Sequence, residues 1–289
     1  MLRNRRGFVL LTVLWATAIA SLLAAEVLAL ARHAIQLSSN RASQRRGAWA
    51  RDACEELLAH RFAKDSVLLG LDTVELGGGL WCRASVEDPD ARIDLNLAND
   101  SVLRAVVVED SLLAALRDWQ DSDTRERAGG AEALWYRSLG RLEPRNAPLE
   151  SVLELRRVHG FEADGVERMA PLLTVDGTGR VNLNRAPASV LGLLPFLTPE
   201  VVRLIVARQR SRQPLAGPED LLALLPPFAR MRATADYPGV LRAVSFQTER
   251  VLVVSEGGRR SAQPVAHALS LYAAAGRRLA LLRREVIDP

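Results

Sequence analysis

The strongest hydrophobic pattern in the chain lies close to its N-terminus. Residues 8–25 carry no charge, and after Glu26 the apolar run continues through residue 31. Eighteen uncharged, largely apolar residues are long enough for a helix that spans a membrane. We therefore predict a transmembrane helix over residues 8–31.

The helical pattern continues beyond the apolar run. Between residues 32 and 62 there is no proline and a single glycine, Gly47. A continuous helix over residues 8–62 would be roughly 80 Å long at 1.5 Å per residue. Its apolar positions recur every four residues, which predicts a face that packs on a sheet. These positions form two stripes: Trp49, Ala53 and Leu57, and Ala50, Cys54, Leu58 and Phe62.

Strand patterns lie at both ends of the remaining sequence. Residues 73–76 and 80–86 flank three glycines and predict a hairpin. Near the C-terminus, glycine turns separate further strand-like runs at residues 250–255, 265–272 and 278–286. Because these runs are short and joined by tight turns, we expect them to pair in an antiparallel sheet.

Between the two strand groups the pattern is helical, and several segments open with proline, which the first turn of a helix tolerates. An internal echo lies in this region: Arg-Ile-Asp-Leu-Asn at residues 92–96 is followed 88 residues later by Arg-Val-Asn-Leu-Asn at 180–184. The echo hints at two related halves. The predicted helices are residues 111–119, 148–159, 163–173, 187–194, 199–210 and 218–225.

These patterns predict an α+β, pilin-like fold, in which a long N-terminal helix packs on an antiparallel sheet. A large all-α domain of helix-hairpin-helix-like (SAM-like) units is inserted into it. The expected organisation is a leader at 1–7, a transmembrane helix at 8–31, a helix extension with the first strands at 32–97, the inserted domain at 98–241 and the closing strands at 242–289.

The distribution of charge bears on the orientation of the N-terminal segment and on the class of partner. Arg3, Arg5 and Arg6 precede the apolar run, so its N-terminal end should remain in the cytoplasm. Taking these three from the 38 basic residues leaves the rest nearly balanced against 34 acidic residues. The body of the chain therefore lacks the basic excess that is typical of a nucleic-acid-binding domain.

The junction at Gly7 and Phe8 has three interpretations. A secretory signal has a shorter apolar core and a small-residue cleavage site after it. A plain signal anchor needs only the apolar helix. In the third interpretation, the short basic leader ending in Gly7 looks like a type IV prepilin leader, which is cut on the cytoplasmic side while the helix is retained.

The two cysteines, Cys54 and Cys82, fall on the predicted helix stripe and on the apolar face of a predicted strand, so both should point into the helix–sheet core. In an oxidising compartment they can form a disulfide. The alternative is two buried free thiols, since unpaired cysteine is often buried. No zinc-ligand spacing, catalytic triad or phosphate-binding loop is present, so we expect an assembly protein and not an enzyme.

One loop carries a cluster of acids. Such a set of hard oxygens is a reasonable cage for Ca²⁺. The alternative is a solvated acidic loop whose charges pair with Arg125 and Arg127. The four acids are Asp118, Asp121, Asp123 and Glu132.

In their order along the chain, these features resemble the K-type minor pseudopilins of bacterial type II secretion systems. The resemblance implies a bacterial inner-membrane protein with a single span and a periplasmic bulk, at the tip of the pseudopilus. The implied partners are the I- and J-type minor pseudopilins, the major pseudopilin and the prepilin peptidase, with no nucleic acid. The residues that carry the resemblance are Gly7–Phe8, Glu87–Asn96, Leu116–Asp123, Gly130–Glu132, Tyr136, Glu154–Phe161, Val181–Asn184 and the closing strands.

The resemblance also assigns roles to individual residues. It implies cleavage between Gly7 and Phe8 with methylation of the new amine, and calcium in the helical domain, although Ala133 stands where an acid is expected. Most pilins carry Glu five residues into the mature chain, whereas this chain has Thr12 there. Because a buried carboxylate would pair with the amine of a subunit ahead, its lack implies that no subunit lies ahead.

Two other functions fit parts of the sequence. Residues 181–210 are similar to a helix-hairpin-helix, which suggests a membrane-anchored DNA receptor of a competence-like system. The hairpin at 195–199 lacks glycine and has two prolines, which removes N–H groups that would hold phosphate. An anchored periplasmic enzyme is the third hypothesis, for which no catalytic arrangement is present.

Overall fold

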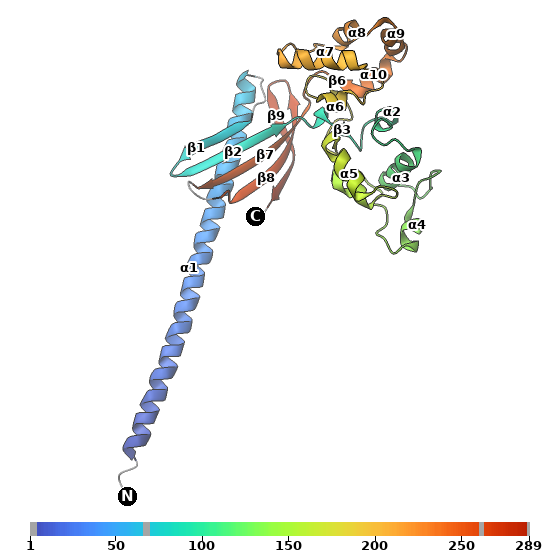
Figure 1. Ribbon diagram of the computed structural model, residues 1–289. Helices are drawn as coiled ribbons and strands as arrows, with labels where there is room; N and C mark the ends of the chain where they lie inside the picture. Colours follow the sequence, from blue (N-terminus) through green and yellow to red (C-terminus); the bar gives the residue numbers. More distant parts are fainter. Residues whose placement is uncertain (1–4, 66–69, 260–262, 288–289) are drawn as a thin grey trace.

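A computed structural model describes residues 5–65, 70–259 and 263–287, with the side chains of residues 10–64, 70–259 and 263–287. Helix α1 (Arg5–Asp65) is continuous over 61 residues, or about 90 Å at 1.5 Å per residue. Its N-terminal half extends away from the rest of the molecule, and its C-terminal part lies against a sheet (Figure 1). The predicted pilin-like fold with an inserted helical domain is confirmed.

The sheet has five antiparallel strands in the order β1-β2-β7-β8-β9. The first two come from the predicted N-terminal hairpin and the last three from the C-terminus, so the sheet closes only after the chain returns from the helical domain. The strands are β1 (Leu71–Gly77), β2 (Leu80–Glu87), β7 (Arg250–Arg259), β8 (Ala266–Ala275) and β9 (Arg278–Ile287).

Helix α1 packs on the central strands with unusually close backbones. A Cβ added at Gly257 would lie 2.2 Å from the carbonyl oxygen of Gly47, so both glycines permit the contact. Beyond this point one predicted stripe, Ala50, Cys54, Leu58 and Phe62, is buried against the sheet. The other stripe turns outward, since the side chains of Trp49 and Leu57 are 58% and 41% exposed.

The helical domain begins where the chain leaves β2 and ends where it enters β7. Residues 93–94 and 244–245 belong to small parallel strand pairs within this domain, so it spans residues 88–249, against the expected 98–241. Its elements are η1 (Pro89–Ala91), β3 (Ile93–Asp94), α2 (Asp100–Leu103), α3 (Asp110–Gln120), α4 (Ala133–Ser138), η2 (Val152–Arg157), α5 (Ala163–Met169), η3 (Ala170–Leu172), β4 (Leu173–Thr174), β5 (Val181–Asn182), α6 (Ala188–Leu191), α7 (Pro199–Arg210), α8 (Pro218–Leu224), α9 (Pro227–Ala235), α10 (Tyr237–Ala243) and β6 (Val244–Ser245).

The internal echo corresponds to two structurally related halves. In the first half, the side-chain amide of Asn96 donates to the carbonyl of Leu149 and accepts from the N–H of the same residue, at 3.0 and 2.8 Å. In the second half, Asn184 makes the same two bonds with Leu215, at 2.9 and 2.8 Å. Each asparagine thus ties the start of its half to a distant loop.

In each half a glutamine adds a further hydrogen bond from its side chain to the backbone. We call the asparagine and glutamine bonds of each half its frame. Gln120 ends α3 and donates to the carbonyl of Leu95 at 3.0 Å, while Gln209 near the end of α7 donates to the carbonyl of Leu183 at 2.8 Å. The parallel pairs β3–β4 and β5–β6 are likewise equivalent. The frame of each half therefore depends on buried backbone groups that side-chain amides satisfy.

Hydrogen bonds to two carboxylates join the sheet to the two halves of the helical domain. Asp88 accepts hydrogen bonds from Asn182 (2.8 Å) and Thr248 (2.6 Å). Asp90 is fully buried and accepts from the backbone N–H of Thr178 at 2.6 Å. Burial raises the pKa of Asp90 to about 6, and the nearby charge of Asp88 adds to the shift. At the same junction, Arg250 donates to the carbonyls of Asp176 and Gly177.

Candidate functional site

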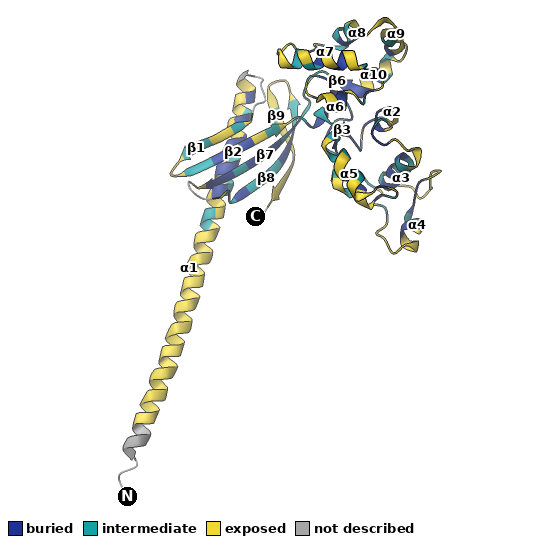
Figure 2. Cartoon of the chain, in the orientation of Figure 1, coloured by how far each residue is buried: buried dark blue, intermediate teal, exposed yellow. Residues whose placement is uncertain are grey.

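The exposed N-terminal part of α1 is the first candidate. Its most apolar 18-residue window has a mean hydropathy of 2.0 and no buried residue, which makes this helix a candidate membrane anchor. Large apolar side chains such as Trp15, Ile19 and Leu22 are more than half exposed. The stem, defined here as residues 10–41 of α1, is thus an apolar and then polar rod that nothing in the described chain covers (Figure 2).

The predicted processing and assembly residues lie at the start of this stem. The Gly7–Phe8 peptide bond falls in the first turns of α1, which begins at Arg5, while the side chains of residues 5–9 lie outside the described part. Thr12 is exposed and lies within the apolar segment of the helix.

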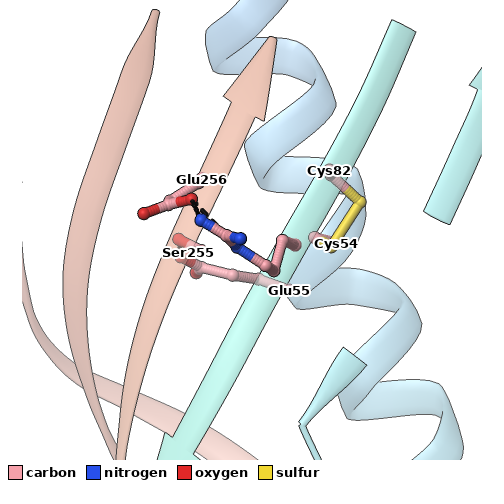
Figure 3. Close-up of a disulfide and its surroundings, with 6 residues drawn as sticks. Cys54, Glu55, Cys82, Ser255 and Glu256 are labelled. Atoms are coloured by element: carbon pink, nitrogen blue, oxygen red, sulfur yellow. Dashed lines mark hydrogen bonds and ion pairs between the residues drawn. A yellow bond between two sulfur atoms is a disulfide. The ribbon is translucent and has the colours of Figure 1, made fainter. Parts of the chain in front are cut away.

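The two cysteines meet where α1 crosses β2. Cys54 and Cys82 are fully buried, and a disulfide joins them with a Cα–Cα distance of 5.9 Å (Figure 3). The crosslink fixes the helix to the sheet close to the Gly47–Gly257 contact. Both side chains point into the helix–sheet core.

Beside the disulfide, a buried carboxylate connects α1 to three strands. Glu55 is 5% exposed and accepts hydrogen bonds from Ser255 at 2.6 Å, Ser270 at 3.0 Å and Tyr272. Arg284 on the edge strand β9 also pairs with it. Burial alone would raise the pKa of Glu55, but the hydrogen bonds and the arginine outweigh it, so the pKa is lowered and the group stays charged.

The acidic loop lies in the first half of the helical domain, after α3. Oxygens of Asp121, Asp123 and Glu132 approach to within 4.8 Å of one another. Asp118, the fourth predicted residue, is fully buried on the last turn of α3, and its carboxylate leaves no room for a side chain at Gly130. The structure thus brings three of the four predicted acids together. The fourth, Asp118, is buried and does not belong to this group.

A guanidinium group lies inside this loop. Arg127 pairs with Asp118 at 2.7 Å and also with Asp121, and its backbone N–H donates to Asp118 at 3.1 Å. Its two acidic partners raise the pKa of Arg127. Arg125 contributes only a backbone N–H, which donates to Asp123 at 2.8 Å. Arg127 therefore neutralises one side of the cluster.

The remaining charge on the other side fits a hard cation. Asp121 Oδ1 and Glu132 Oε1 are buried and have no hydrogen-bond partner among the described residues. Burial raises the pKa of Glu132, and the charges of Asp118, Asp121 and Asp123 raise it further. Orphaned carboxylate oxygens of this kind match the ligands that Ca²⁺ takes, although Ala133 supplies none.

The helix-hairpin-helix resemblance finds little support in the geometry of the hairpin before α7. The N–H of Leu197 bonds the carbonyl of Leu194, and the N–H of Val201 bonds the side chain of Thr198. Pro199 has no N–H. Because these donors are used within the hairpin, the DNA-receptor alternative is not favoured.

Sequence reasoning missed two of these features. Glu55 was not identified, because a charged residue in a helix normally faces solvent. A signal was present, since Arg51 and Glu55 follow the buried Ala50 and Cys54 by one position each and thus lie beside the same stripe. Asp88 and Asp90 were noted only as part of a motif, and nothing in the sequence indicated that they would join the sheet to both halves.

Part of this chain is similar in sequence to a known protein family. Residues 96–177 match the family described as type II secretion system protein K. The type II secretion system protein K of Klebsiella pneumoniae is 39% identical over 102 residues, 34% of this chain and 31% of that protein. The chain thus spans about a third of the length of the curated relative that it matches.

A solved structure shows the same fold. A chain of the GspK–GspI–GspJ complex from the enterotoxigenic Escherichia coli type 2 secretion system superposes with a TM-score of 0.63 at 16% identity. The superposition covers 89% of this chain and 100% of the other.

The fold and the stem define a pilin-like fold with a candidate membrane anchor and an inserted helical domain. Within this class, residues 96–177 match the type II secretion system protein K family, in agreement with the resemblance to K-type minor pseudopilins.

Proposed function

We propose that this protein is the minor pseudopilin at the tip of a type II secretion pseudopilus, where it initiates assembly and supports protein export across the outer membrane. The I- and J-type minor pseudopilins are its direct partners, with the major pseudopilin below them. It is anchored in the bacterial inner membrane, and its sheet and helical domain lie in the periplasm.

The observation that supports this proposal is the combination of two features in one chain. A protein K domain is inserted into a sheet, and the helix that packs on this sheet continues into an exposed apolar stem. The stem supplies the helix through which pilin-like subunits assemble. The helical domain, residues 88–249, stands beside the sheet (Figure 1) and is too bulky for a closely packed fibre wall. A single position at the end of the fibre accommodates it.

The partner assignment is tested by reconstituting the full chain in detergent with the I- and J-type pseudopilins. We expect a stable complex that does not polymerise, and a secretion defect or altered fibre length when the gene is deleted. Many copies along the whole fibre would contradict the tip position. Thr12→Glu should raise the number of copies in the fibre, because it supplies the carboxylate that pairs with a subunit ahead.

We propose that the prepilin peptidase cuts between Gly7 and Phe8 and that the new Phe8 amine is methylated. The basic leader followed directly by the apolar helix supports this assignment. Mass spectrometry of the purified protein should find N-methyl-Phe8 at the N-terminus. A retained Met1, or an N-terminus beyond Ala24, would contradict the prepilin assignment.

We further propose that Asp121, Asp123 and Glu132 hold Ca²⁺, with Asp118 behind them. Binding to the native state stabilises it by RT ln(1 + [L]/Kd), or about 2.7 kcal/mol at a hundredfold excess over Kd. Millimolar Ca²⁺ should raise the melting temperature of the full chain, and Asp123→Asn should abolish the shift. Asp164→Asn, an exposed acid on α5, is the matched control. A wild-type chain indifferent to Ca²⁺ leaves the loop as an Arg127-neutralised turn.

A further inference from the structure

A small cavity of about 450 Å³ lies where α1 leaves the sheet on its way toward the stem. It is bounded by α1 on one side and by the β1–β2 turn and the end of β7 on the other. We call this cavity the arginine notch, and it is lined by Arg45, Arg46, Trp49, Gly78, Leu80 and Arg259.

The notch combines positive charge with an aromatic surface. All three arginines are exposed, no acid lines the cavity, and none of the three forms an ion pair within the described part of the chain. In the helical domain, Arg127 and Arg117 do have carboxylate partners. Trp49 is 58% exposed at the rim. Exposed tryptophan and arginine are the residues that most often dominate binding at protein interfaces.

The chemistry that fits the notch is a group of carboxylates next to an apolar surface. A guanidinium group binds a carboxylate through two parallel hydrogen bonds, which gives both affinity and orientation. Such a partner would remove the repulsion among the three arginines. It would also cover the face of Trp49.

The position of the notch separates a protein partner from lipid. Arg45 follows the end of the apolar run at residue 31 by 14 residues, roughly 20 Å along the helix. The headgroup region of a bilayer extends only about 5–8 Å beyond the hydrocarbon. The notch is also continuous with the exposed flank of the stem, on which another N-terminal helix would pack. With the helix upright, headgroups do not reach it.

We propose that the arginine notch receives an acidic surface of a second pilin-like subunit whose N-terminal helix lies along the stem. This inference rests on the proposed function and specifies where on the globular part the partner docks. It predicts a partner with two or more carboxylates near the point where its own helix meets its sheet. It also predicts an assembly step that is sensitive to salt, because exposed charges are screened.

The test compares two double variants of the full chain in detergent. Arg45→Glu with Arg46→Glu reverses the notch. Arg61→Glu with Arg210→Glu makes the same change in charge at exposed sites away from it. Affinity for the I- and J-type pseudopilins is measured at 50 and 500 mM salt. The notch variant should bind at least tenfold more weakly at low salt, and the control within about twofold of wild type.

Other outcomes overturn the inference separately from the proposed function. If the notch variant binds the pseudopilins like wild type, the docking site is wrong while the assembly role stands. If it loses affinity only for vesicles of phosphatidylglycerol, the notch is a lipid site. A wild-type chain that binds neither pseudopilin refutes the proposed function itself. Equal melting temperatures of the variants, expected for exposed side chains, show that folding is not the cause.

Discussion

The two halves of the helical domain have equivalent frames. They differ in the length of chain between the main helix of each half and the loop that its asparagine binds. In the second half, α7 ends at Arg210 and the chain reaches Leu215, the partner of Asn184, within a few residues. In the first half, the acidic loop and α4 intervene between α3 and Leu149, the partner of Asn96. The second half thus has the same asparagine and glutamine bonds without an acidic loop.

The largest effect is expected from the asparagines of the frame. Asn96→Ala leaves the backbone groups of Leu149 without partners, at a cost of about 1–3 kcal/mol for each unsatisfied group. Asn184→Ala should do the same in the second half. We expect each to lower the local stability of its own half by about 2–4 kcal/mol, measured by hydrogen exchange with mass spectrometry. A large effect in one half only would show that the two frames are not energetically equivalent.

The next effect concerns the contact between the halves. Residue Thr178 follows Asp90 by 88 residues, the repeat distance, and bonds to it. Because the pKa of Asp90 is raised from 3.8 to about 6, the folded state keeps a proton that the unfolded chain has lost between those pH values. The free energy of unfolding should therefore fall as the pH rises from 4 to 6, by about 2–3 kcal/mol from this group.

Asp90→Asn isolates that contribution, because an amide keeps the acceptor oxygen and does not titrate in this range. Denaturant unfolding of both proteins between pH 4 and 7 should give curves that differ in slope only within this window. Identical slopes would mean that Asp90 is as easily ionised in the folded as in the unfolded chain. Asp164→Asn on the surface serves as the control and should follow the wild type.

The smallest effect is expected at Arg127, which has no counterpart in the second half. Arg127→Gln removes the ion pair to the buried Asp118, and because the arginine is half exposed we expect a loss of about 1–2 kcal/mol without calcium. The same change removes a competing cation, so it should tighten the binding of Ca²⁺. Calorimetric titration that shows weaker binding in this variant would mean that the arginine supports the site. Arg104→Gln, an exposed ion-paired residue outside the loop, is the control.

Much of the architecture could be predicted from the sequence because it follows from the periodic spacing of apolar residues and from the residues that mark turns. The uninterrupted helix, all five long strands and both ends of α7 were predicted from apolar spacing and glycine turns. Helices α9 and α10 were not predicted, although Pro227 and Pro238 occupy first turns, where proline is tolerated. The predicted helix at 148–159 is a short 3-10 segment, Val152–Arg157.

The site was only partly predictable, for a different reason. The acids of the loop are close in sequence, so their clustering was visible as composition. The partners of Glu55 and Asp90 lie far along the chain, as with Ser255 and Thr178. Whether a carboxylate is buried depends on such distant donors, which a local pattern does not reveal.

The attachment of α1 to the sheet has a mechanical consequence. A pull on the membrane end of α1 loads its contact with the sheet in shear, and three linkages share that load: the Gly47–Gly257 contact, the Cys54–Cys82 bond and the polar contacts of Glu55. The sulfur bridge carries tension directly from the helix to β2, so the backbone between the two cysteines bears little of it. If the chain is the first subunit of a fibre, as proposed above, traction on the N-terminal end of α1 would be delivered through this bond to the middle of the sheet.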